Sequence, residues 1–166
     1  MRKNEYEDLV KVRKVIAEEG EKLAKNTAYR KQVLVCGGTG CTSSGSVQLL
    51  DEFEKQLAEN GLDKEVKVVK TGCFGLCALG PVVVVYPEGA FYSQVQTEDV
   101  AEIVTEHLLK GRIVDRLVYR DEHTADVVEE AAKSVSLNDT QFYKPQKRIV
   151  LRNCGVIDPD NIEEYI

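Results

Sequence analysis

Residues 32–41 read Gln-Val-Leu-Val-Cys-Gly-Gly-Thr-Gly-Cys, an apolar run that leads directly into a glycine-rich loop bounded by two cysteines. A short apolar run of this kind predicts a buried strand. Several hydroxyl side chains between Thr42 and Ser46 then offer N-cap oxygens for a helix over residues 46–60. The sequence therefore predicts a strand, a cysteine loop and a helix in succession.

The helix and the segment after it complete a β-α-β unit. Residues 65–70 predict a second strand, and Gly61 is suited to end the helix before it. Because such units cross over right-handedly within one sheet, we expect the two strands to be parallel. The expected buried stripe of the helix consists of Val47, Leu50, Phe53 and Leu57.

A second cysteine loop, Cys73-Phe-Gly-Leu-Cys77, follows the second strand. Two further strands are predicted over residues 82–86 and 91–95, with a turn between them that makes a hairpin. A last helix is expected to be capped by Thr97 and to end at Gly111. Its expected inward-facing residues are Val100, Ile103, Val104 and Leu108. The order β-α-β-β-β-α is an α/β layout of the thioredoxin-like kind.

The sequence on either side of this unit has a different character. The unit itself spans residues 31–111, and an amphipathic helix is expected over residues 1–30. Residues 112–147 are charged and lack a clear period, which predicts a linker. Residues 148–166 open with a strand-like run over 148–153 and predict the start of a further, truncated domain.

Composition narrows the functional class. The chain has 22 basic and 28 acidic residues, a net charge of −6, which argues against a nucleic acid partner. It has no run of eighteen apolar residues, so no membrane span is expected. Its charged start does not resemble a signal peptide, which predicts a cytoplasmic location. Cysteines in a reducing compartment indicate metal or redox chemistry rather than disulfides.

Four of the five cysteines form two tight pairs, Cys36 with Cys41 and Cys73 with Cys77. The spacing is C-x4-C, then 31 residues, then C-x3-C. Each pair follows a strand of the predicted parallel pair, and the carboxyl ends of parallel strands lie at one edge of the sheet. The four thiols are therefore expected to form one site. The glycines around them let the backbone wrap a bulky group and direct N–H groups at sulfur.

Several alternatives remain open from the residues alone. A four-cysteine site that holds zinc or a metal cluster could brace a non-redox interaction module, although zinc sites usually show C-x2-C pairs. Thiol exchange is disfavoured because C-x-x-C is absent. Cys154, His107 and His123 are better explained as packed or surface residues than as ligands. Neither cysteine loop contains His, Asp, Glu or Lys, so no catalytic residue is assigned and electron transfer is the predicted role.

Val35-Cys-Gly-Gly-Thr-Gly-Cys41, Thr71-Gly-Cys-Phe-Gly-Leu-Cys77 and Gly80-Pro81 together resemble the thioredoxin-like [2Fe-2S] ferredoxin family. The same module forms the small iron–sulfur subunit of respiratory complex I. The resemblance implies a [2Fe-2S] cluster that transfers single electrons. It also implies the cluster ligands, which are Cys36, Cys41, Cys73 and Cys77.

The tail has a resemblance of its own. Residues 143–155, with Ile157-Asp-Pro159, are similar to the start of the NADH- and flavin-binding subunit, particularly in β subunits of soluble NAD(P)-linked [FeFe]-hydrogenases and formate dehydrogenases. This likeness implies other subunits of such a complex as partners, the hydrogenase catalytic subunit among them. FMN, NAD(P) and [4Fe-4S] clusters are expected only in a downstream part, and self-association stays open.

Overall fold

The computed structural model describes residues 29–120, 136–155 and 157–159 of the chain. The helix expected over residues 1–30 lies outside the described residues except for its last two positions, and residues 160–166 also lie outside them. His123 falls in the undescribed part of the expected linker. Among the described helices, none is long and apolar enough to cross a membrane.

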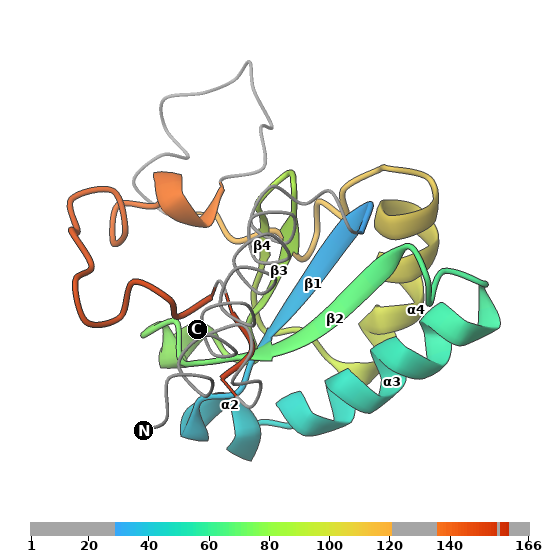
Figure 1. Cartoon of the computed structure of the whole chain (residues 1–166), viewed down its shortest axis with the longest axis horizontal. Helices are drawn as coiled ribbons and strands as arrows, with labels where there is room; N and C mark the ends of the chain where they lie inside the picture. Colours follow the sequence, from blue (N-terminus) through green and yellow to red (C-terminus); the bar gives the residue numbers. More distant parts are fainter. Residues whose placement is uncertain (1–28, 121–135, 156, 160–166) are drawn as a thin grey trace, which may run out of the picture.

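A four-stranded mixed sheet with the order β2-β1-β3-β4 forms the centre of the fold (Figure 1). Its strands are β1 (Lys31–Cys36), β2 (Val66–Thr71), β3 (Val83–Tyr86) and β4 (Ala90–Tyr92). The first two strands are parallel, whereas β3 runs antiparallel to both β1 and β4. The predicted thioredoxin-like α/β architecture and its parallel pair are confirmed. The last strand is shorter than the predicted 91–95.

The register of the parallel pair fixes where the cysteine loops begin. Lys31 pairs with Val66 at one end, and Cys36 pairs with Thr71 at the other. Parallel strands in this register end side by side, so the segments that follow β1 and β2 leave the sheet at the same edge. Cys36 therefore lies beside the residue that precedes the second cysteine loop by two positions.

Two helices follow the first strand, where one was predicted. A short helix, α2 (Thr39–Ser43), takes up part of the expected loop and carries Cys41, and α3 (Ser46–Glu59) follows it. The N-cap of α3 is Gly45, with φ of 97° and no side-chain cap, so the predicted hydroxyl caps are wrong. The chain turns sharply between α2 and α3, and glycine adopts the left-handed conformation there at little cost.

The buried face of α3 differs from the predicted stripe. Leu49, Phe53 and Leu57 are buried, but Val47 is 42% exposed and Leu50 is half-buried. The buried positions repeat every four residues, which is still helical spacing. Spacing alone could not distinguish between two neighbouring stripes, and the packing of α3 on the sheet selects the one that contains Leu49.

The last helical segment runs from Thr97 to Leu109 and includes α4 (Val100–Glu102). Its cap is a reciprocal pair, Gln96 with Asp99, rather than the predicted Thr97. The backbone N–H of Gln96 donates to Asp99 Oδ2 at 2.8 Å. Gly111, with φ of 73°, follows the helix as expected. The four residues predicted to face inward, Val100, Ile103, Val104 and Leu108, are all fully buried.

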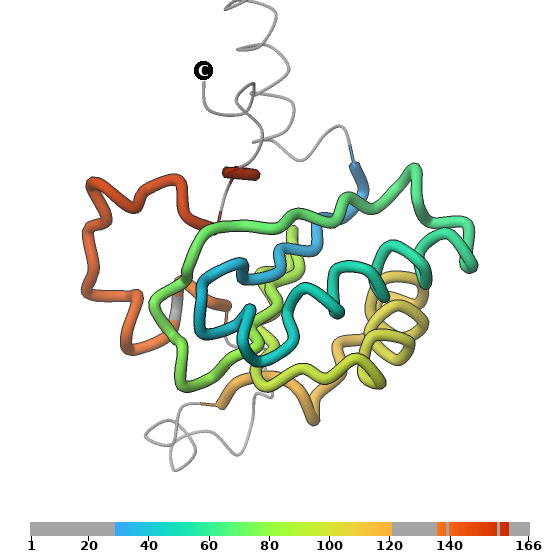
Figure 2. The backbone as a smooth tube through the Cα atoms, turned by 90° about the horizontal axis from the view of Figure 1, so that it is seen from below, coloured from blue at the N-terminus to red at the C-terminus, as the bar shows by residue number. Residues whose placement is uncertain are grey.

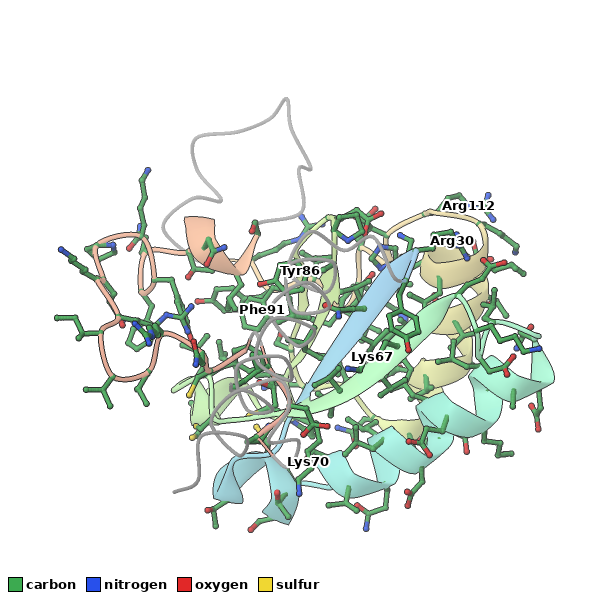
Figure 3. All side chains as sticks on the ribbon, viewed as in Figure 1. Arg30, Lys67, Lys70, Tyr86, Phe91 and Arg112 are labelled. Carbon is green, nitrogen blue, oxygen red and sulfur yellow. The ribbon has the colours of Figure 1, made fainter. Side chains whose placement is uncertain are left out.

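The sheet has a packed core on each face. Alternate residues of β1 point to opposite faces, so Val33 and Val35 join the core beneath α3 and α4, whereas Leu34 and Cys36 join the other core. Figure 3 shows Phe91 on the sheet, and this residue belongs to the second core. That second core continues into residues far along the chain, including Leu137 and Tyr143.

The described parts of the expected linker pack on the sheet. Val118 forms a β-bridge with Tyr92, and Ser136 forms one with Ala90. The strand expected over residues 148–153 does not form, because this segment bends and turns instead. We call residues 136–155 and 157–159 the C-terminal strap, since they pass beside the second cysteine loop (Figure 2).

Candidate metal centre

The first cysteine pair is buried. Cys36 is the last residue of β1 and is 2% exposed, and Cys41 on α2 is 1% exposed. Burial, followed by the neighbouring Cys36 thiol, raises the pKa of Cys41 to about 12. With its pKa raised, the Cys41 thiol remains protonated until a cation favours the thiolate. Such a pair is chemically suited to metal binding rather than to free thiolate nucleophilicity.

The second cysteine pair is exposed. The Sγ atoms of Cys73 and Cys77 lie 3.9 Å apart, and the Cys73 thiol is the main cause that raises the pKa of Cys77. Gly75, whose φ is +80°, donates its backbone N–H to Cys73 Sγ at 3.3 Å. Glycine adopts this positive φ at little cost.

Glycines bring the two pairs together. A Cβ atom on Gly38 would lie 2.9 Å from Cys73 Cβ, and one on Gly80 would lie 2.8 Å from Cys41 Sγ. Gly40 faces Cys77 in the same way, at 3.3 Å from its Cβ. Any other residue at Gly38 or Gly80 would push the loops apart. Sulfur atoms accordingly lie at the end of the sheet where β1 terminates (Figure 3).

The thiols are arranged as two pairs rather than as one compact group. Within residues 29–120, 136–155 and 157–159, no group of three or more His, Cys, Asp or Glu is placed to hold a single metal ion. The electrostatic influence of Cys36 extends to Cys77, which links the two pairs. Two pairs, each able to hold one iron, and an N–H donor aimed at sulfur fit a [2Fe-2S] cluster. The structure thus brings all four predicted residues to one edge of the sheet.

The structure also settles the positions of two residues that the sequence favoured as packed. His107 is fully buried, and its Nδ1 lies 2.7 Å from the Tyr92 hydroxyl, within the core rather than at the cysteines. Cys154 is half-buried, and its Sγ lies 3.2 Å from the position that a Cβ on Gly72 would take. Cys154 is therefore a neighbour of the second loop despite its distance in sequence.

The C-terminal strap contacts the second loop at residues that sequence reasoning missed. The Tyr143 hydroxyl donates to the Phe74 carbonyl, and the Gly155 N–H donates to Thr71 Oγ1 at 2.8 Å. The Thr71 hydroxyl in turn donates to the Ile157 carbonyl at 3.3 Å. Burial raises the pKa of Tyr143, so its hydroxyl keeps its proton at neutral pH. These residues follow no periodic pattern. Only the adjacent aromatic residues Phe142 and Tyr143 indicate a packed segment in the sequence.

Comparison with known proteins finds relatives of this part of the chain. The family model described as thioredoxin-like [2Fe-2S] ferredoxin matches residues 21–108, more than half of the chain. The chain is 48% identical over 77 residues to a [2Fe-2S] ferredoxin of Clostridium pasteurianum, covering 46% of this chain and 76% of that protein. It is 46% identical over 79 residues to a [2Fe-2S] ferredoxin of Aquifex aeolicus, covering 47% of this chain and 71% of that protein.

A solved structure gives the same result. The crystal structure of the wild-type thioredoxin-like [2Fe-2S] ferredoxin from Aquifex aeolicus superposes with a TM-score of 0.51 and 39% identity. The match covers 57% of this chain and 100% of that one. The family match ends at residue 108, so the C-terminal strap lies outside the matched module.

Proposed function

Because the chain belongs to the thioredoxin-like [2Fe-2S] ferredoxin family and transfers electrons through a [2Fe-2S] cluster, we propose that Cys36, Cys41, Cys73 and Cys77 are the ligands of that cluster. Each iron then takes one cysteine pair. The observation that carries this assignment is the close approach of the two loops through Gly38 and Gly80, which brings both pairs to one sheet edge.

The proposed ligand set suits electron transfer rather than substrate chemistry. When bound, the cluster supplies a one-electron redox centre whose iron atoms are fully ligated by sulfur. The loops that surround it contain no His, Asp, Glu or Lys, the side chains that usually move protons in catalysis. The described chain contributes backbone N–H groups, thiolates and an apolar surround, and it provides no open ligand position for a substrate.

Electrons are proposed to enter and leave on the side of Cys73 and Cys77. These two residues are exposed, whereas Cys36 and Cys41 are buried against the core. A partner cofactor can therefore approach the second loop more closely than the first.

We further propose that this module serves an NAD(P)-linked hydrogenase or a related oxidoreductase complex in the cytoplasm. The support is the likeness of residues 143–159 to the start of a flavin-binding subunit. An exposed apolar run agrees with a surface that packs on a neighbouring domain or subunit, since Ile149, Val150 and Leu151 are 74%, 91% and 56% exposed. In this proposal the module spans residues 31–111, and residues 148–166 begin the flavin domain, with FMN, NAD(P) and [4Fe-4S] clusters downstream.

The test of the cluster assignment is chemical. Chain purified anaerobically is expected to contain about two irons and two acid-labile sulfides, and its visible absorption should bleach with dithionite. Stoichiometric zinc without sulfide would instead support the alternative of a zinc-braced interaction module.

The proposed complex has a separate test. Residues 1–166 alone should not oxidise NADH or NADPH with a dye acceptor. Oxidation at the rate of a complete NAD(P)-linked subunit would contradict the proposed division of labour.

A further inference from the structure

One peptide unit of the second cysteine loop is hydrogen-bonded at both of its polar ends. The amide between Phe74 and Gly75 supplies the N–H that donates to Cys73 Sγ at 3.3 Å. The carbonyl of the same amide accepts a hydrogen bond from the Tyr143 hydroxyl. Tyr143, the Phe74–Gly75 amide and Cys73 therefore form a continuous chain of donors and acceptors that ends on a cysteine sulfur.

Hydrogen bonds in such a chain strengthen one another. A donor at the carbonyl draws electron density toward the oxygen and leaves the N–H of the same amide more positive. The effect is larger where water is excluded, and Tyr143 and Phe74 are only 6% and 3% exposed. A stronger N–H donor on a cluster sulfur stabilises the reduced, more negative state in preference to the oxidised one.

We propose that Tyr143 is a positioning residue that raises the reduction potential of the [2Fe-2S] cluster by polarising the Phe74–Gly75 amide toward Cys73. The proposal rests on the assignment of Cys73 as a cluster ligand. It assigns a redox role to a residue of the C-terminal strap, beyond residues 21–108 that match the family. The strap, which lies outside the family module, would in this way influence the reduction potential of the cluster.

The surroundings of Tyr143 keep its hydroxyl in place. The Arg148 guanidinium lies over the Tyr143 ring, 4.9 Å from its centroid, and donates to the Cys154 carbonyl at 2.9 Å. The strap has a second, independent anchor at Thr71, the last residue of β2, through Gly155 and Ile157. Replacing Tyr143 by Phe therefore removes one hydroxyl while the ring and the other anchor remain.

The experiment compares the 166-residue chain with its Tyr143→Phe variant, both loaded with the cluster under anaerobic conditions. We expect the midpoint potential of Tyr143→Phe to be more negative in a redox titration. Resonance Raman spectra should show a smaller shift of the terminal Fe–S stretching bands on exchange into deuterium oxide, because the hydrogen bond from the Gly75 N–H to Cys73 Sγ is weaker. Tyr119→Phe is the matched control, since its ring contacts Phe91 in the same core, and both quantities should stay unchanged.

A second variant separates polarisation from simple support of the loop. Thr71→Val removes the other anchor of the strap and leaves the Phe74–Gly75 amide bonded at both ends, so its deuterium shift should equal that of the unaltered chain. The proposal would be overturned if the midpoint potential changed equally in Tyr143→Phe and Thr71→Val. It would also be overturned if Tyr143→Phe had an unchanged potential or lost its cluster. Failure of the ligand assignment is distinguishable, because Cys73→Ala would then keep the full [2Fe-2S] spectrum.

Discussion

The two cysteine loops hold their thiols by different means. The first loop continues directly from β1 into α2, and Cys36 and Cys41 are buried in a core. The second loop leaves Cys73 and Cys77 exposed, and its shape depends on hydrogen bonds from a strap about seventy residues away in sequence. One half of the site is thus organised by the regular fold, and the other half by a tertiary contact. The exposed half is the one that a partner can reach and that the strap can tune.

The largest effect is expected from replacing single cysteines, which tests whether both loops are needed to hold the cluster. Replacing any one of Cys36, Cys41, Cys73 or Cys77 by Ala should abolish the cluster or leave it strongly destabilised, because each iron would lose a thiolate. Visible absorption and iron content measure the loss. Cys154→Ala is the control, since Cys154 lies beside Gly72 but outside both pairs, and it should retain the spectrum. A colourless Cys154→Ala would overturn the four-ligand assignment.

The core beneath α3 and α4, on the other face of the sheet from Cys36 and Cys41, should respond to acid through His107. Burial lowers the pKa of His107 from 6.5 to about 4. The unfolded chain therefore binds the proton more readily, so stability is fully present above pH 6.5 and is lost as the pH falls toward 4. The contribution amounts to about 2 kcal/mol between pH 7.5 and pH 5.

Denaturant unfolding of the unaltered chain and of His107→Gln, at both pH values, measures this contribution. His107→Gln is expected to lose less of its unfolding free energy on acidification than the unaltered chain does. An identical loss in both proteins would show that His107 is not held neutral by the core.

Moving the loops apart should have an intermediate effect. Gly80→Ala places a Cβ atom 2.8 Å from Cys41 Sγ, so a loop must shift, at a cost of about 1–3 kcal/mol. We expect lower cluster occupancy and faster loss of colour in the presence of a chelator. Gly61→Ala is the control, because a Cβ there meets nothing within 4 Å, although Gly61 has a positive φ and Gly80 does not. That substitution strains the backbone away from the cysteines, so its cluster should be as stable as in the unaltered chain. Equal chelator sensitivity in both variants would contradict the steric argument.

The smallest expected effect concerns the attachment of the strap to the second loop. Thr71→Val removes the hydrogen bond from Gly155 and the one to Ile157, at a cost of about 1 kcal/mol. Hydrogen exchange should become faster in the strap while β1 and α3 stay protected. Thr105→Val removes a hydroxyl bonded within its own helix and should leave the strap unchanged. Faster exchange throughout the sheet in Thr71→Val would show that strap and core unfold as one unit.

Local sequence patterns determined most of the module. Apolar runs and helical spacing predicted the strands and the inward face of the last helix, because the periods of two and 3.6 residues decide which side chains share a face. The meeting of four cysteines followed as well, since parallel strands end at one edge of the sheet. The patterns failed where two solutions were equally periodic, as with Val47 and Leu49 on α3, and where a cap depended on one side chain, as with Gln96.

Only the tertiary structure decided the arrangement around the second loop. The sequence predicted a linker and a strand where the C-terminal strap packs irregularly. It gave no indication that Tyr143 contacts Phe74 or that Cys154 lies beside Gly72. An irregular segment has no repeating pattern, so its position depends on which single side chains find partners once the core has formed. The sequence by itself therefore determined that the four cysteines lie at one edge of the sheet, and the tertiary packing decided how each pair is held there.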